Sequence, residues 1–158
     1  MSNTVSVDLE TLYPVMLETL NSGNSFTFSP KGKSMLPLIR QGVDSVKISP
    51  ICGKLNKYDL PLYRRSNGQF VLHRVVGVSN DKYIMCGDNQ FIYEYGIEDS
   101  QLIGLVTEII KPEGIIRTSD KSYISYCRKR VFTQLIKRYF SKVKSFIKKV
   151  LVFLHLYK

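Results

Sequence analysis

The sequence is poor in the residues that hold metal ions or form disulfide frameworks. Its 158 residues include two histidines and three cysteines, and Cys52, Cys86 and Cys127 form no C-x-x-C pair. No histidine lies near a cysteine at the spacing of metal ligands, so we expect neither a zinc site nor a set of disulfide bonds. We therefore predict free thiols in a reducing compartment, with no metal and no cofactor.

The N-terminal segment lacks the features of a targeting or membrane-spanning segment. Residues 1–21 have neither a basic start nor an unbroken apolar run, which disfavours a signal peptide and a membrane anchor. With 44% apolar residues, a chain of this length suits one globular domain with its own core. We expect a cytoplasmic protein, either free or peripheral at the inner membrane surface.

Acidic residues are absent from residues 121–158. That segment holds 11 Lys and Arg residues, whereas residues 1–120 hold 12 together with all 13 acidic residues, so the net charge of +10 belongs to the tail. From about Tyr123 onward apolar residues recur at helical spacing, with basic residues mostly between them. The apolar positions are Val131, Leu135, Ile136, Tyr139, Phe140, Val143, Ile147, Val150, Leu151 and Leu154. We predict a basic amphipathic helix, or a broken pair of helices.

Three roles suit such a tail: a helix that covers the core, an anchor on an anionic membrane surface or a partner, and a nucleic-acid contact. The apolar end, residues 150–157, is far shorter than the roughly 20 residues that span a bilayer. Basic and apolar side chains on opposite faces suit the surface of an anionic leaflet. Nucleic acid is disfavoured, because the strand region has no basic patch and no known recognition motif.

Short alternating segments between residues 24 and 118 predict a strand-rich core. A helix capped by Asp8 precedes it, with apolar residues from Leu9 to Leu20 and an end at Asn21-Ser22-Gly23. The expected strands are residues 25–29, 46–48, 60–63, 69–78, 82–85, 102–110 and 114–117. This spacing favours a mainly β, antiparallel domain over βαβ units. We therefore divide the chain into residues 1–120, the β domain with its helix, and residues 121–158, the tail.

Ser34 and His73 are the candidate nucleophile and base. Ser34 stands in the segment Gly32-Lys33-Ser34-Met35-Leu36-Pro37, where a turn between two apolar runs presents one hydroxyl. A serine hydroxyl is a poor nucleophile near neutrality, so acyl transfer needs a base within reach and donors for the developing oxyanion. His73, in Val71-Leu72-His73-Arg74-Val75-Val76-Gly77, is one of only two histidines. Taken separately, such a serine is more often an ordinary turn residue, and such a histidine a buried core residue.

Four motifs in order resemble the signal peptidase I superfamily of serine peptidases, which includes the LexA-type autoproteases. They are the Ser34 and His73 segments, Tyr58-Asp59-Leu60-Pro61-Leu62-Tyr63-Arg64 between them, and Gly87-Asp88-Asn89 after them. The resemblance covers about residues 26–106. It implies an antiparallel β domain and a nucleophile at Ser34.

The same resemblance implies that His73 is the base, as in the archaeal and endoplasmic-reticulum branch of the superfamily. Asp88 would lie near the site and orient the imidazole. Glu94 is the alternative, because Tyr93-Glu94 stands where the endoplasmic-reticulum enzymes carry paired aspartates. The hydroxyl that many bacterial members carry two residues before the nucleophile is replaced by Gly32, which leaves backbone donors for the oxyanion.

These observations predict a serine endopeptidase that cleaves a peptide or pre-protein, of the signal- or leader-peptide type, through an acyl-enzyme on Ser34. If substrate preference follows the resemblance, small side chains precede the cut. A non-catalytic binding or scaffolding protein of the same fold is the main alternative. A self-cleaving LexA-type regulator is a further one, although the roughly 30 residues before Ser34 leave no room for a helix-turn-helix domain.

Overall fold

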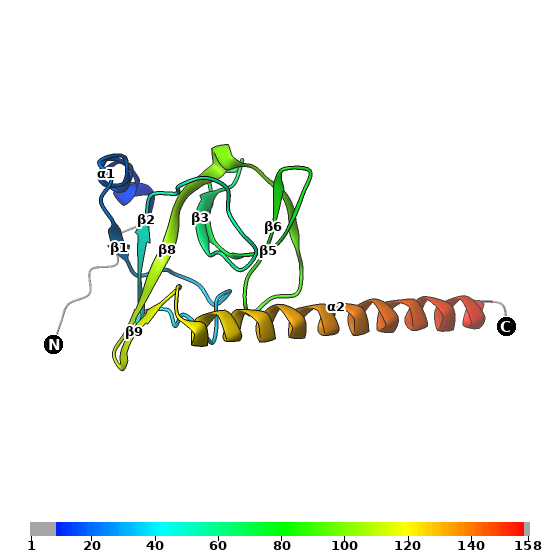
Figure 1. The fold of residues 1–158 in the computed structure, drawn as a ribbon. Coiled ribbons are helices and arrows are strands. Elements are labelled where there is room, and N and C mark those ends of the chain that lie inside the picture. Colours follow the sequence, from blue (N-terminus) through cyan, green and yellow to red (C-terminus); the bar gives the residue numbers. More distant parts are fainter. Residues whose placement is uncertain (1–8, 157–158) are drawn as a thin grey trace.

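The computed structural model describes the backbone of residues 9–156 and the side chains of residues 9–140, 143 and 150. Two antiparallel sheets lie between an N-terminal and a C-terminal helix (Figure 1). The fold is therefore mixed α/β, not mainly β as the sequence predicted, since helices make up nearly as much of the chain as strands. The expected antiparallel pairing and the two terminal helices are confirmed.

Helix α1 spans Leu9–Asn21, with Pro14 inside it. Its buried side chains Met16 and Leu20 pack into the main core, and the chain then turns at Gly23, whose positive φ of 78° suits glycine. The helix agrees with the prediction, while its expected cap Asp8 lies outside the described residues.

The larger sheet has the order β1-β2-β8-β3-β4, with β9 paired to β8. Its strands are β1 (Phe26–Phe28), β2 (Ser45–Ser49), β3 (Pro61–Arg64), β4 (Phe70–Leu72), β8 (Leu102–Lys111) and β9 (Gly114–Arg117). Strand β8 is central because β2, β3 and β9 all pair with it. Alternating buried residues such as Val46 and Ile48 face the core, as the sequence pattern indicates.

The smaller sheet has the order β5-β6-β7, formed by Arg74–Ser79, Lys82–Cys86 and Glu94–Ile97. A short 3₁₀ helix, η1 (Asp99–Gln101), leads from β7 into β8. A second hydrophobic cluster, which includes Tyr63, Val75 and Met85, is built from strands of both sheets. The sequence predicted one strand over residues 69–78, but the chain passes from one sheet to the other at His73.

Helix α2 is one continuous helix, Lys121–Leu156. It runs along one side of both sheets and then extends well beyond them (Figure 1). Tyr123, Cys127, Val131 and Gln134 are at most 3% exposed, so the first part of α2 belongs to the core although it begins at the boundary expected for a separate tail. No helix among the described residues is long and apolar enough to cross a membrane.

Candidate active site

The turn that carries Ser34 lies between β1 and β2, and its apolar residues are buried in the main core. Met35 is 4% and Leu38 7% exposed, while Ser34 itself is half-buried. The Gly32 backbone N–H donates to the Gln41 side chain at 2.9 Å, and the Leu36 N–H donates to the Lys33 carbonyl at 3.3 Å. Buried anchors on one side and turn hydrogen bonds on the other fix the position of the serine.

His73 occupies the single residue between β4 and β5, and it is 6% exposed. The chain changes sheets at this point, so His73 lies where the two sheets join. A Cβ placed on Gly87 would come within 3.0 Å of His73 Nε2 and within 2.8 Å of the Ser34 carbonyl oxygen. Gly87 thus lets Nε2 and the nucleophile turn approach the same point.

Ser34 and His73 line one cavity of about 480 Å³. Arg65 and Asn89 also line it, and both of them, together with His73, line a neighbouring cavity bounded by Phe91. The two hollows therefore meet at His73. A bound peptide could occupy both sides of the imidazole, as cleavage between two parts of a chain requires.

Tyr63 and Glu94 complete the surroundings of His73 on its Nδ1 side. The Tyr63 hydroxyl donates to Glu94 Oε2 at 2.7 Å and lies 3.4 Å from His73 Nδ1. Glu94 Oε2 itself is 3.9 Å from Nδ1. Arg65 binds the same carboxylate through two N–H groups, at 2.7 and 2.6 Å.

This arrangement selects one tautomer of the neutral imidazole. The only proton of the Tyr63 hydroxyl is used in the bond to Glu94, so the Tyr63 oxygen acts as acceptor toward His73. The proton must then sit on Nδ1, which leaves the lone pair on Nε2, the nitrogen beside the Ser34 turn. Burial, and then the hydrogen bond to Glu94, raise the pKa of Tyr63 well above its usual range, so its hydroxyl keeps its proton.

Burial also keeps His73 in the neutral form that a general base needs. It lowers the pKa of His73 to about 4, although the negative charge of Glu94 acts in the opposite direction. For Glu94, burial acts to raise the pKa, but hydrogen bonds from Arg65 and Tyr63 outweigh it and lower the pKa below its usual value. Near neutral pH the site thus holds a neutral imidazole beside an ionised carboxylate.

Asp88, the first candidate for orienting His73, has another role. It is fully buried and forms an ion pair with the fully buried Arg74, at 2.8 and 2.7 Å. Tyr126 donates to the same carboxylate at 3.0 Å. No hydrogen bond of the described residues joins Asp88 to His73, because Arg74 and Tyr126 take up its oxygens. Glu94 is therefore the carboxylate that faces the imidazole.

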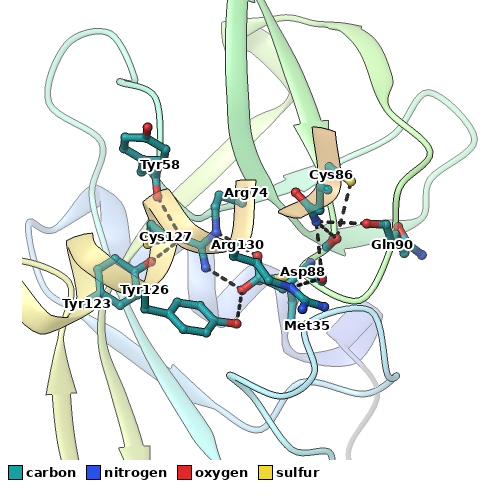
Figure 2. Close-up of polar contacts among 12 residues, drawn as sticks. Met35, Tyr58, Arg74, Cys86, Asp88, Gln90, Tyr123, Tyr126, Cys127 and Arg130 are labelled. Atoms are coloured by element: carbon teal, nitrogen blue, oxygen red, sulfur yellow. Dashed lines mark hydrogen bonds and ion pairs between the residues drawn. The ribbon is translucent and has the colours of Figure 1, made fainter. Parts of the chain in front are cut away.

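Arg74 connects the site to α2, as Figure 2 shows. Burial alone would lower the pKa of Arg74, but its hydrogen bonds to Asp88 raise it, so the guanidinium is charged. Its Nη1 group lies within hydrogen-bond distance of the Tyr58 carbonyl at 3.0 Å, the Tyr123 hydroxyl at 2.9 Å and the Cys127 sulfur at 2.8 Å. Each nitrogen of the guanidinium thus has a hydrogen-bond partner, which helps to offset the cost of burying two charges.

Helix α2 also holds the turn formed by residues 87–90, which lies beside Ser34. The Gln134 amide donates to the Gly87 carbonyl at 2.7 Å and to the Gln90 carbonyl at 3.0 Å, and Arg130 donates to the Asp88 carbonyl. In turn, the Asn89 backbone N–H donates to the Ser34 carbonyl at 2.7 Å. Hydrogen bonds therefore run from α2 through this turn to the backbone of Ser34, the candidate nucleophile.

Four residues around the site were not predicted from the sequence: Tyr63, Arg65, Arg74 and Gln134. Tyr63 lies inside a motif that we had compared with the superfamily, but the motif does not show that its hydroxyl faces His73. A signal for Gln134 was present, because Tyr123, Cys127, Val131 and Gln134 recur at intervals of four, four and three residues. That spacing marks a second helical face, which the stronger apolar stripe obscured.

Two features bear on the readiness of the site for reaction. No hydrogen bond of the described residues joins the Ser34 hydroxyl to His73, a contact that often tightens only when substrate binds. Nor does any hydrogen bond among the same residues use the backbone N–H of Ser34, which leaves that group free to donate to an oxyanion.

Comparison of the chain with protein-family models, with curated proteins and with solved structures found no match.

Proposed function

We propose that the chain is a serine endopeptidase of the signal-peptidase type, in which Ser34 attacks and His73 accepts the proton. The observation that carries the proposal is the shared cavity, in which the Nε2 side of a neutral imidazole faces the Ser34 turn. The motif resemblance and the antiparallel sheets agree with it. A peptide or pre-protein is the substrate, with small side chains before the cut.

The chemistry follows from the tautomer. Ser34 Oγ forms a bond to the carbonyl carbon of the substrate while its proton passes to His73 Nε2. The imidazolium is stabilised by Glu94, both through the Tyr63 hydroxyl and at 3.9 Å directly. The oxyanion is placed to accept from the Ser34 backbone N–H.

The second half of the reaction uses the same groups. As the tetrahedral intermediate collapses, the Nε2 proton passes to the leaving amine and the acyl group stays on Ser34. Water then gives a proton to Nε2 and attacks the acyl carbon. As this second tetrahedral intermediate collapses, the bond to Ser34 Oγ breaks and the Nε2 proton passes to that oxygen, which releases the acid and restores both residues. Glu94, Tyr63 and Arg65 hold the imidazole and need not change their covalent state.

The test is cleavage of a peptide library by the full chain and by two variants, Ser34→Ala and His73→Ala. Both variants should lose turnover to a similar extent, and the double variant should lose no more, because the two residues act as one unit. Circular dichroism would confirm that each variant is folded. Equal turnover by the wild type and Ser34→Ala, on a peptide that both bind, would favour a binding or scaffolding protein.

A further inference from the structure

Helix α2 presents an apolar face that no part of the described chain covers. Besides Val150, six of its described apolar side chains are between 37% and 68% exposed. They are Phe132, Leu135, Ile136, Tyr139, Phe140 and Val143, and we call them the α2 stripe. Because they are separated by three or four residues, neighbouring members touch along the helix, and Tyr139 and Phe140 have ring centroids 6.1 Å apart.

The α2 stripe faces away from the β domain. At roughly 100° per residue, its centre lies about 150° around the helix from the buried face of Tyr123, Cys127, Val131 and Gln134. In Figure 1 the sheets lie on one side of α2, and the helix continues beyond them. The stripe is therefore not packing surface for the core, which was one of the three roles expected for the tail.

Charge distinguishes between the remaining candidate partners of the α2 stripe. Residues 121–158 contain 11 Lys and Arg residues and no acidic residue, so two such helices from separate copies would repel each other. Nucleic acid would neutralise the charge but leave the aromatic and aliphatic stripe in water. A lipid surface with anionic headgroups satisfies both features, because it offers negative charge beside a hydrocarbon boundary.

We propose that α2 docks the protein on an anionic membrane surface, with the helix in the plane of the interface. The α2 stripe enters the boundary between headgroups and acyl chains. Arg128 and Lys129, which are exposed and lie about 50° to either side of the centre of the stripe, stay at the level of the phosphates. Arg138 instead binds Tyr95 of the β domain. The β domain then lies on the aqueous side, since it packs against the opposite face of α2.

The test is co-sedimentation of the full chain with vesicles of phosphatidylglycerol mixed with phosphatidylcholine, and with phosphatidylcholine alone. Wild-type protein should bind the anionic vesicles, bind the neutral ones at least tenfold more weakly, and lose affinity as salt shortens the Debye length. Phe140→Glu and Leu135→Glu should each lower the affinity for anionic vesicles by at least about tenfold, because each places a charge where an apolar group is buried.

A matched control is Val78→Glu. Val78 is 51% exposed at the end of β5, so it resembles Leu135, at 48%, in exposure but lies away from the α2 stripe. This variant should bind vesicles as the wild type does. The proposal would be overturned if wild-type protein failed to bind, bound both vesicle types equally, or kept its affinity in both stripe variants.

A different partner of the α2 stripe would give a different binding result. A concentration-dependent dimer in light scattering that Phe140→Glu abolishes, with no vesicle binding, would assign the α2 stripe to a second copy of the chain. Binding to an acidic polypeptide but not to vesicles would assign it to a protein partner. None of these measurements requires turnover, so the result is independent of the proposed peptidase activity.

Discussion

At the scale of single residues, the proposed mechanism depends on which nitrogen of His73 carries the proton. Tyr63 decides this, because its own proton is committed to Glu94 and its oxygen can only accept. A tyrosine thus stands where a carboxylate was expected to contact the imidazole, and Glu94 acts through it. The carboxylate alternatives were visible in the sequence, but the intervening hydroxyl was not.

Replacing Tyr63 by phenylalanine tests this arrangement. Tyr63→Phe removes the acceptor for the Nδ1 proton, so kcat/KM should fall by about tenfold, the equivalent of one hydrogen bond of about 1–1.5 kcal/mol. Tyr83→Phe is the control, because Tyr83 is also buried and hydrogen-bonded, to Asp99 at 2.7 Å and to the Leu55 N–H at 3.2 Å. It should keep the activity of the wild type. Similar losses in both variants would mean that a general packing defect is responsible.

The pH dependence follows from the burial of His73. Because the pKa of His73 is lowered to about 4, the acid limb of kcat/KM should lie near pH 4, where a solvated histidine would place it between 6 and 7. The free energy of unfolding should also decrease at low pH. The imidazole of the unfolded chain binds its proton more readily, so the contribution of His73 to stability is complete above about pH 6.5 and is lost as pH falls toward 4. A limb at 6–7 in the pH–rate profile would show that His73 is solvated or is not the base.

Gly87 should tolerate no side chain. In Gly87→Ala the new methyl group would meet the Ser34 carbonyl oxygen at 2.8 Å and His73 Nε2 at 3.0 Å, so one of them must move and activity should drop by tenfold or more. Gly77→Ala is the comparison, since its nearest contact is the tip of the Ile84 side chain at 3.4 Å. Measurement of kcat/KM for both folded variants would show whether the loss of activity is specific to Gly87. Normal turnover by Gly87→Ala would contradict the geometry described for the site.

At the scale of elements, the strands followed from the sequence and their division into two sheets did not. Alternation of apolar and polar residues marked β1, β2, β6, β8 and β9 closely. The run through residues 69–78 is apolar on both sides of His73, so its pattern does not reveal that β4 and β5 belong to different sheets. Strand β7 was missed because its residues Glu94–Ile97 include a charge and a glycine.

The packing of the first part of α2 on the core was also not predicted from the sequence. Its apolar stripe dominates the helical pattern and suggested a tail that is separate from the core. The face that packs on the core is mixed, with Tyr123, Cys127 and Gln134 binding polar groups of the site. Polar side chains that serve a buried network look like solvent-facing positions until the partner element is known.

The ion pair between Arg74 of β5 and Asp88 of the turn after β6 is the buried group to which Tyr123 and Tyr126 of α2 bind, and its loss should be costly. Asp88→Ala leaves a buried guanidinium without its carboxylate, so the free energy of unfolding should fall by about 3–5 kcal/mol. Lys82→Gln, which removes a pair exposed to about half on both sides, should cost less than about 1 kcal/mol. Urea titrations of both variants give the comparison. A small effect of Asp88→Ala would show that the buried pair does not hold these elements together.

Truncation tests the division of α2 directly. A chain that ends after Phe140 keeps Tyr123, Cys127, Val131 and Gln134 and should unfold with nearly wild-type stability, because residues 141–156 extend beyond the sheets (Figure 1). A chain that ends at Asp120 removes all four buried side chains and should be much less stable, losing several kcal/mol. Thermal unfolding measures both. Equal melting temperatures for the two truncations would assign the whole helix to the tail.

At the scale of the whole molecule, one helix both supports the candidate site and presents an uncovered apolar face. The first part of α2 binds the turn of residues 87–90 beside Ser34, while we propose that the α2 stripe on its outer face binds an anionic membrane. The sequence indicated the basic, amphipathic character of this helix, since composition and period suffice for that. The direction of each face required the packing of the β domain.

The most direct test of the central claim is covalent labelling of Ser34. A fluorophosphonate reagent should add once to the full chain, peptide mass spectrometry should place the adduct on Ser34, and the labelling rate should fall below about pH 5 as the imidazole becomes protonated. His73→Ala should slow the labelling by at least about a hundredfold, the contribution expected of a general base. Labelling of another residue, or an equal rate in His73→Ala, would contradict a Ser34–His73 nucleophile and base.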